Sequence, residues 1–139
     1  MTVLPDSVQA FLDEQVVGVL ATRSAGGRVH QSIVYYTRDG DELLISTEAP
    51  RRKARDVEET GWASVCVMGH ERPFPSVTVY GAASIRREDI GPATARIAQR
   101  MLALGEPPEP QSDEALAGVG RVIIAVEVER VGPANYLDR

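Results

Sequence analysis

Residues 46–59 read STEAPRRKARDVEE, and four of the chain's fifteen basic residues occupy positions 51–55 within this stretch. Pro50 immediately before them predicts the first turn of a helix, which would run to about residue 60. The amino end of a helix carries partial positive charge and free N–H groups, so cations there are unfavourable until an anion joins them. The cluster therefore predicts either a phosphate site or, as the alternative, an exposed helix whose ion pairs contribute little energy.

Spacing along this helix separates the four cations into two pairs. Arg52 and Arg55 each have an acidic residue four positions further on, although base before acid is the weaker order. Arg51 has another arginine at that spacing, and Lys53 has an acid only three positions on. We therefore expect Arg51 and Lys53 to be the two cations left for a ligand.

Few side chains outside the cluster offer further chemistry. Ser46 and Thr47 lie just upstream and can add hydroxyl donors to a phosphate site. His30 and His70 are far apart in sequence and lack a Cys or His at ligand spacing, so no metal site is expected. The single Cys66 lies in the apolar run WASVCVM and is expected to be a small core residue. Without an evident nucleophile or paired carboxylates, any catalysis would depend on a cofactor.

Composition limits the classes of partner. Twenty acidic against fifteen basic residues give a net charge of −5, and only 5% of residues are aromatic, so a nucleic-acid partner is not expected. No apolar run approaches the roughly 20 residues that span a bilayer, and the N-terminus lacks the pattern of a signal peptide. We expect one domain over residues 1–139, in a cytoplasmic protein without a membrane partner.

The elements that must position the basic cluster are mostly short strands. Alternating apolar patterns and turn signals predict six strands and three helices. The strands are expected at 16–23, 28–38, 42–47, 62–69, 76–85 and 120–132, and the helices at 5–14, 50–60 and 88–104. Residues 105–118 are expected to be a loop with room for one helical turn. Gly81 inside the fifth strand indicates a bulge or a close backbone approach. The expected fold class is mainly β with peripheral helices, and the expected architecture is a small six-stranded antiparallel barrel. The sequence contains neither a Rossmann nor a P-loop motif.

The order of several segments resembles a known family. After the first helix and strand come GGRVHQSIVYY, DGDELLIST, APRRKARDVEE, WASVCVM and SVTVYGAASI, an order similar to that of the pyridoxamine 5′-phosphate oxidase-like split barrels. Within them the chain is most similar to the flavin/deazaflavin oxidoreductases, and its ending, RVIIAVEVERVGPANYLDR, resembles the deazaflavin-dependent biliverdin reductases of that group. The resemblance implies a split barrel of the FMN-binding type that forms a homodimer, with the cofactor at the subunit interface.

The resemblance also implies which residues meet the cofactor. Relatives hold the cofactor phosphate with basic residues after the third strand, and here these positions are Arg51 and Lys53 with Arg52 adjacent. Small polar side chains near the phosphate correspond to Ser46 and Thr47.

A second group of implied site residues lies on the strand that flanks the cofactor ring in relatives. Its members here are Ser32, Val34 and Tyr36. Alternation places these three on one face of the strand and Ile33 and Tyr35 on the other, and the sequence does not decide which face meets the cofactor.

The expected activity is that of an oxidoreductase. A reduced deazaflavin, coenzyme F420, would transfer hydride to a conjugated small molecule, with the proton supplied by solvent, Tyr36 or His30. The alternatives are an FMN-dependent oxidoreductase of the same family and a non-catalytic carrier of flavin or haem. The substrate-binding signature of the true pyridoxamine phosphate oxidases is missing, so vitamin B6 oxidation is not expected. The substrate would depend on residues 70–76 and 105–119.

Overall fold

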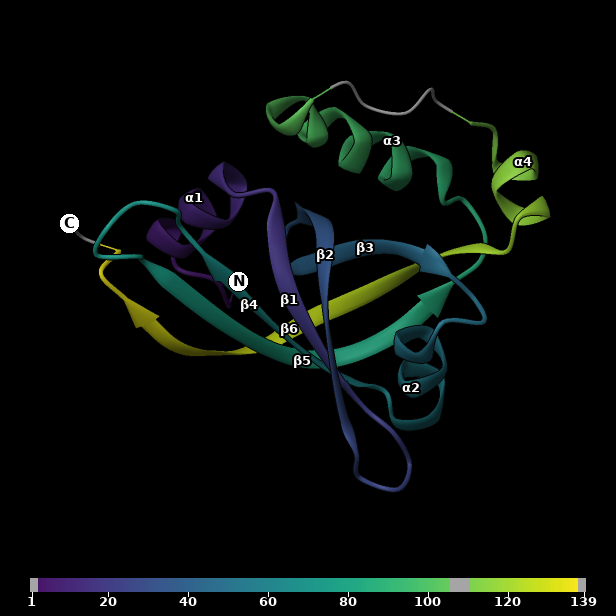
Figure 1. The fold of residues 1–139 in the computed structure, drawn as a ribbon, viewed down its shortest axis with the longest axis horizontal. Helices are drawn as coiled ribbons and strands as arrows, with labels where there is room; N and C mark the ends of the chain where they lie inside the picture. Colours follow the sequence, from purple (N-terminus) through teal and green to yellow (C-terminus); the bar gives the residue numbers. More distant parts are fainter. Residues whose placement is uncertain (1–2, 106–110, 138–139) are drawn as a thin grey trace.

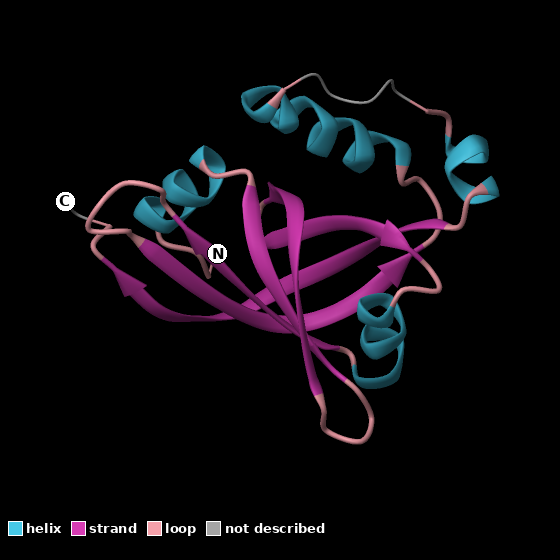
Figure 2. Cartoon of the chain, viewed as in Figure 1, coloured by secondary structure: helices cyan, strands magenta, loops and turns pink. Residues whose placement is uncertain are grey.

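Six antiparallel strands close into a barrel, with helices at its ends and on one side (Figures 1 and 2). The structure is a computed structural model and describes residues 3–105 and 111–137. The strands are β1 (Val17–Arg23), β2 (Val29–Asp39), β3 (Glu42–Glu48), β4 (Trp62–Met68), β5 (Ser76–Arg86) and β6 (Arg121–Asn135). The helices are α1 (Asp6–Glu14), α2 (Arg52–Thr60), α3 (Gly91–Arg100) and α4 (Asp113–Gly118), and a 3-10 turn, η1 (Met101–Leu104), extends α3.

The strand order around the barrel is β1-β2-β3-β6-β5-β4, and every neighbouring pair is antiparallel. Short turns join β1 to β2 and β2 to β3. The positive φ of Gly40, 60°, lets the second turn reverse within two residues. The mainly β fold and the closed six-stranded barrel expected from the sequence are thus confirmed.

The described residues form two apolar clusters. The larger one occupies the barrel interior and receives the inward side chains of the strands together with α1 and Val57 of α2. The smaller one lies outside the barrel, where Leu44 and Ile123 on β3 and β6 pack against Ile97 of α3 and Leu116 of α4. Since strand residues alternate between faces, β3 and β6 supply side chains to both clusters.

The β5–β6 pair contains the bulge expected at Gly81. The register shifts between Tyr80 and Gly81, and a Cβ at Gly81 would lie 1.7 Å from the carbonyl oxygen of Glu127. Only glycine permits this approach of the two backbones.

The C-terminal half departs from expectation in two places. The helix expected over 88–104 is helical from Gly91 and tightens to a 3-10 turn after Arg100. The short helix α4 lies where one helical turn was expected within the loop at 105–118, of which residues 106–110 lie outside the described part of the chain. β6 continues to Asn135 because β5 pairs with it over nearly its whole length.

The expectation that Cys66 is a core residue was wrong. Its side chain points out of β4 and is exposed, whereas its neighbours Val65 and Val67 point into the barrel and are fully buried. The apolar run that contains it is not strictly alternating, so the sequence did not reveal which residues face outward.

Candidate functional site

The candidate site begins where β3 passes into α2 at one end of the barrel (Figure 1). Ala54 and Val57 anchor the helix against the barrel and are buried. Gly61 ends the helix in the left-handed conformation, with a φ of 65°, and its N–H donates to Val57 O at 2.8 Å. These contacts hold α2 against the barrel and leave Arg51, Arg52 and Arg55 exposed.

The first turn of α2 is well suited to an anion. Hydrogen bonding within the helix starts with the Arg55 N–H, which donates to Arg51 O at 3.1 Å, so the N–H groups of residues 52–54 are not used inside the helix. No acidic residue lies in this turn, and no side chain caps it. The helix dipole, the spare N–H groups and the cations therefore all favour negative charge here.

Lys53 is the most enclosed cation of the cluster. Its Nζ donates to Ser32 Oγ on β2 at 3.4 Å, which joins the helix to the strand. Burial, followed by the nearby Arg51 guanidinium, lowers the pKa of Lys53 below its ordinary value. Within residues 3–105 and 111–137, neither Arg51 nor Lys53 forms an ion pair. The expectation that these two cations have no ion-pair partner therefore holds for this part of the chain.

Arg52 faces a different neighbour. Its Nη1 lies 3.8 Å from Oδ1 of Asp56, as the spacing predicted. The Asp56 side chain is only 1% exposed, and its other oxygen accepts a hydrogen bond of 2.9 Å from the buried Thr22 hydroxyl of β1. The pair expected between Arg55 and Glu59 is absent from the ion pairs of the described residues, and Glu59 instead accepts from the Ala25 N–H at 3.2 Å.

A cavity lies between α2 and the turn that joins β1 to β2. Its volume is about 470 Å³. Ser24, Gly26, Arg28, Val29, His30, Arg52 and Asp56 line it. We call it the hairpin cavity, and Arg52 is the one residue of the basic cluster that reaches it.

The two hydroxyl residues upstream of the cluster point to opposite faces of β3. Thr47 faces inward and is 4% exposed, whereas Ser46 faces outward. Ser46 lines a groove of about 310 Å³ beneath α3 and α4, together with Tyr35, Ile97, Met101 and Arg121 among others. The structure therefore does not gather Ser46 and Thr47 at one point, and we refer to the second space as the α3 groove.

The three expected residues on β2 also separate. Ser32 lies beside Lys53 at the end of the barrel, but Val34 and Tyr36 point into the core, where they are 6% and 0% exposed. Their side chains are out of reach of any ligand on the outer surface. The opposite face of the same strand, with Ile33 and Tyr35, is the exposed one.

Tyr36 is also no proton donor for an outside substrate. Its hydroxyl donates to Leu12 O at 2.6 Å, and burial raises the pKa of this phenol. The Arg100 guanidinium lies 5.0 Å from the ring and donates to the Tyr36 carbonyl at 2.8 Å. His30, the other donor considered, is exposed at the hairpin cavity.

Sequence reasoning missed the partners that come from distant segments. Thr22 and Asp56 are 34 positions apart, and nothing in the local pattern pairs them. A buried acid on a polar helix gives only an indirect signal, because the apolar residues Ala54 and Val57 place the same helix face toward the barrel.

Comparison with known proteins now gives the family. The family model described as pyridoxamine 5′-phosphate oxidase matches residues 4–133. The chain belongs to the pyridoxamine 5′-phosphate oxidase family. The barrel described above is thus the split barrel of this flavin-related family. No curated protein matches the sequence.

Solved structures share the fold across nearly the whole chain. A protein described as an F420 reductase is 23% identical, with a TM-score of 0.75 and coverage of 93% of this chain and 98% of that one. The haem storage protein HutZ from Vibrio cholerae is 18% identical, with a TM-score of 0.69 and 96% of both chains covered. A FAD-binding protein from Mesorhizobium loti is 21% identical, with a TM-score of 0.67 and 88% of both chains covered. At these identities the similarity establishes the fold.

The residues at the start of α2 fit a phosphate-bearing cofactor. A donor set for phosphate oxygens is formed by the spare helix N–H groups, the Ser32 hydroxyl, and Arg51 and Lys53, which pair with no acid in the described part of the chain. Among the described residues no cluster of three or more His, Cys, Asp or Glu side chains could hold a metal ion. No helix in the described ranges is long and apolar enough to cross a membrane.

Proposed function

We propose that the protein is an oxidoreductase that uses reduced coenzyme F420 to transfer hydride to a conjugated small molecule. The observation that carries the proposal is the pair Arg51 and Lys53 at the amino end of α2, which has no ion-pair partner among the residues that the structure describes. Family membership and the fold shared with an F420 reductase support it.

In this proposal the chain binds and orients the cofactor. Lys53, Arg51 and the first-turn N–H groups hold the phosphate, and Ser32 keeps the Lys53 ammonium directed along β2. The exposed Arg55 adds charge for an acidic tail. The deazaflavin supplies the hydride when bound. The outer face of β2, with Ile33 and Tyr35, offers an apolar surface that excludes water beside the ring.

FMN is the second candidate, on a specific observation. Arg52 lies near Asp56, so only Arg51 and Lys53 remain directed at the helix entrance, and two cations suffice for one phosphate. A carrier of flavin or haem without turnover is the third outcome to be tested, since the fold is shared with a haem storage protein.

Cofactor titration tests the proposal. The chain has one tryptophan, Trp62, which directly follows the Gly61 that ends α2, so its fluorescence reports on this end of the barrel. We expect F420 to quench it with a micromolar dissociation constant. Reduced F420 should then be oxidised when members of a panel of quinones, enones and tetrapyrroles are added.

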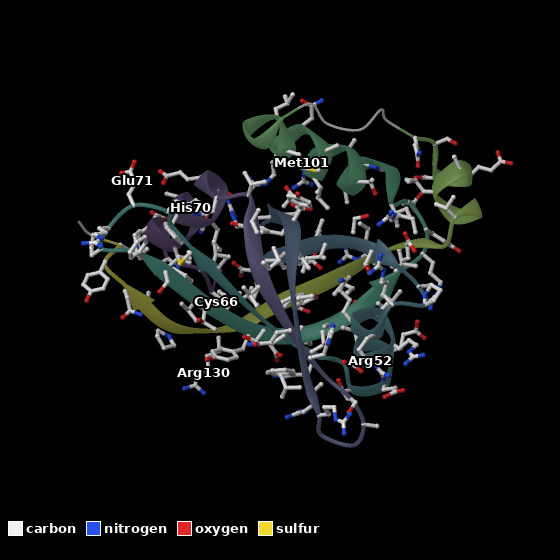
Figure 3. All side chains as sticks on the ribbon, in the orientation of Figure 1. Arg52, Cys66, His70, Glu71, Met101 and Arg130 are labelled. Atoms are coloured by element: carbon white, nitrogen blue, oxygen red, sulfur yellow. The ribbon has the colours of Figure 1, made fainter. Side chains whose placement is uncertain are left out.

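The possible outcomes separate the candidates. Tighter binding of FMN transfers the proposal to the flavin, and binding without substrate-dependent oxidation favours the carrier. If neither cofactor binds at micromolar concentration, the proposal is wrong. Lys53→Gln should weaken cofactor binding. Arg130→Gln is its control, because Arg130 is exposed on β6, far from Arg52 (Figure 3).

We further propose that two copies associate through the outer face of β2, β1 and β4. Ile33 is 75% exposed, Val19 lies directly opposite it on β1, and Cys66 lies opposite Val19 on β4. Tyr35 and Met68 extend this apolar strip and are 42% and 49% exposed. A contiguous exposed apolar surface of this kind favours a protein partner.

Ile33→Asp tests the association. Wild type should elute with twice the 15.1 kDa mass of one chain in light scattering, and the variant with the mass of one chain. Val119→Asp is the control, because Val119 is 63% exposed but lies after α4, away from the strip. Wild-type protein of single-chain mass at micromolar concentration would contradict the proposal.

A further inference from the structure

The hairpin cavity has a charged lining that suits a ligand. Two arginines from different elements, Arg28 of the turn and Arg52 of α2, meet at it with His30. Lys53, in the first turn of α2, contacts Ser32 on β2 and not the hairpin cavity. The cavity is thus separate from the proposed cofactor phosphate site and needs its own explanation.

The decisive feature of the cavity is Asp56. Its Oδ1 is buried and has no hydrogen-bond partner among the described residues, although the side chain helps to line the cavity. Arg52 Nη1 stands 3.8 Å from this oxygen, beyond hydrogen-bond distance. A buried carboxylate oxygen without a hydrogen bond is costly, and an ionised carboxylate can only accept. A ligand that satisfies it must bring a donor hydrogen.

The walls of the cavity are held in place before any ligand arrives. The Arg28 N–H donates to Ser24 Oγ at 3.1 Å, and the Ser24 N–H donates to Arg28 O at 2.9 Å. Glu59 on α2 accepts from the Ala25 N–H at 3.2 Å and ties the turn to the helix. Ser24 keeps its own hydroxyl hydrogen for donation. The site is therefore pre-organised, which lowers the entropic cost of binding.

We propose that the hairpin cavity binds a protonated oxyanion, namely hydrogen phosphate or a singly protonated phosphomonoester. Arg28 and Arg52 pair with its charged oxygens, and its O–H donates to Asp56 Oδ1. The same geometry rejects sulfate and phosphodiesters. These ions carry no proton near neutral pH, so they would leave Oδ1 without a hydrogen bond and place a negatively charged oxygen beside it. Loss of one hydrogen bond to a charged group corresponds to roughly ten- to hundredfold in affinity.

Histidine proton NMR provides a local readout. The chain has two histidines; His30 lines the cavity, and His70 lies at the far end of the molecule from Arg52 (Figure 3). We would titrate inorganic phosphate, methyl phosphate, dimethyl phosphate and sulfate at about pH 6, near the second pKa of a phosphomonoester. The His30 signal should move saturably with phosphate and methyl phosphate, and His70 should not follow it. The half-saturating concentration of sulfate or dimethyl phosphate should be at least roughly tenfold higher than that of phosphate.

A response to phosphate but not to methyl phosphate would assign the site to the free ion. A response to both would assign it to phosphoryl groups in general. Equal responses to phosphate and sulfate, or no saturable response of His30, would overturn the proposal.

Variants separate this cavity from the proposed cofactor site. Asp56→Asn should bring the phosphate and sulfate midpoints within about threefold, because an amide can donate as well as accept. Arg28→Gln changes an exposed residue and should weaken phosphate roughly tenfold while the protein stays folded. Lys53→Gln should leave the His30 response unchanged although it weakens F420 binding, and Arg130→Gln should change neither. An Asp56→Asn protein that keeps the full preference, or an Arg28→Gln protein with wild-type affinity, would contradict the assignment.

Discussion

Replacing Lys53 by Gln should make the protein more stable and its cofactor binding weaker. Lys53 is the second residue of α2, where the ammonium faces the positive end of the helix dipole, is partly buried and stands near Arg51. A charge opposed to a helix dipole costs about 0.3–1 kcal/mol. Against this gain, the substitution removes a long hydrogen bond of 3.4 Å to Ser32 Oγ. We therefore expect the free energy of unfolding to rise by about 0.3–1 kcal/mol and Tm by roughly 1–4 °C.

The pH dependence of this stabilisation has a defined sign. The folded-state pKa of Lys53 lies below the ordinary value of 10.5, so the unfolded chain binds more protons as the pH approaches that range. The charged ammonium destabilises the wild type. This destabilisation disappears as the pH rises through the lowered pKa toward 10.5, because the ammonium loses its charge in the folded protein. The stability difference between Lys53→Gln and wild type should be full at pH 7 and shrink at alkaline pH.

Urea unfolding of both proteins at pH 7 and pH 10, followed by Trp62 fluorescence, measures these differences, and F420 titration measures the change in affinity. Removal of one charge-assisted hydrogen bond to phosphate should weaken F420 binding roughly ten- to hundredfold. Arg130→Gln is the control, because Arg130 is exposed on β6 and lies far from Arg52 of α2 (Figure 3). A Lys53→Gln protein that is less stable than wild type and binds F420 with unchanged affinity would refute the reasoning.

Two further predictions concern the framework. Arg100→Met should lower the free energy of unfolding by about 2–4 kcal/mol in urea unfolding, because the guanidinium donates to carbonyls of α1 and β2, including Tyr36 O at 2.8 Å and Asp13 O at 3.1 Å. A decrease no larger than that of Arg130→Met would show that these hydrogen bonds are replaced by water. Gly81→Ala should give little folded protein on expression, or a fall of about 3 kcal/mol or more, since its Cβ would overlap Glu127 O at 1.7 Å. Near-wild-type Tm would mean that the β5–β6 bulge relaxes freely.

The sequence by itself determined the barrel and the location of the unusual charge. Alternating apolar residues, turn glycines such as Gly40 and the bulge at Gly81 are local signals, and they predicted the strands with small boundary errors. The lack of an ion pair for Arg51 and Lys53 among the described residues also agrees with the spacing, because ion pairs along a helix depend on residues three and four positions apart. Both are short-range properties of the chain.

Only the tertiary structure decided which face of each strand is outside and what meets the helix. Val34 and Tyr36 belong to the core because barrel closure turns that side of β2 inward, while Cys66 stands outside for the same reason. Asp56 meets Thr22 across 34 positions, and the β1–β2 turn folds back over α2 to form the hairpin cavity. Such contacts depend on the register of strands far apart in sequence. A shift of one residue would turn every side chain to the other face, so local pattern cannot specify them.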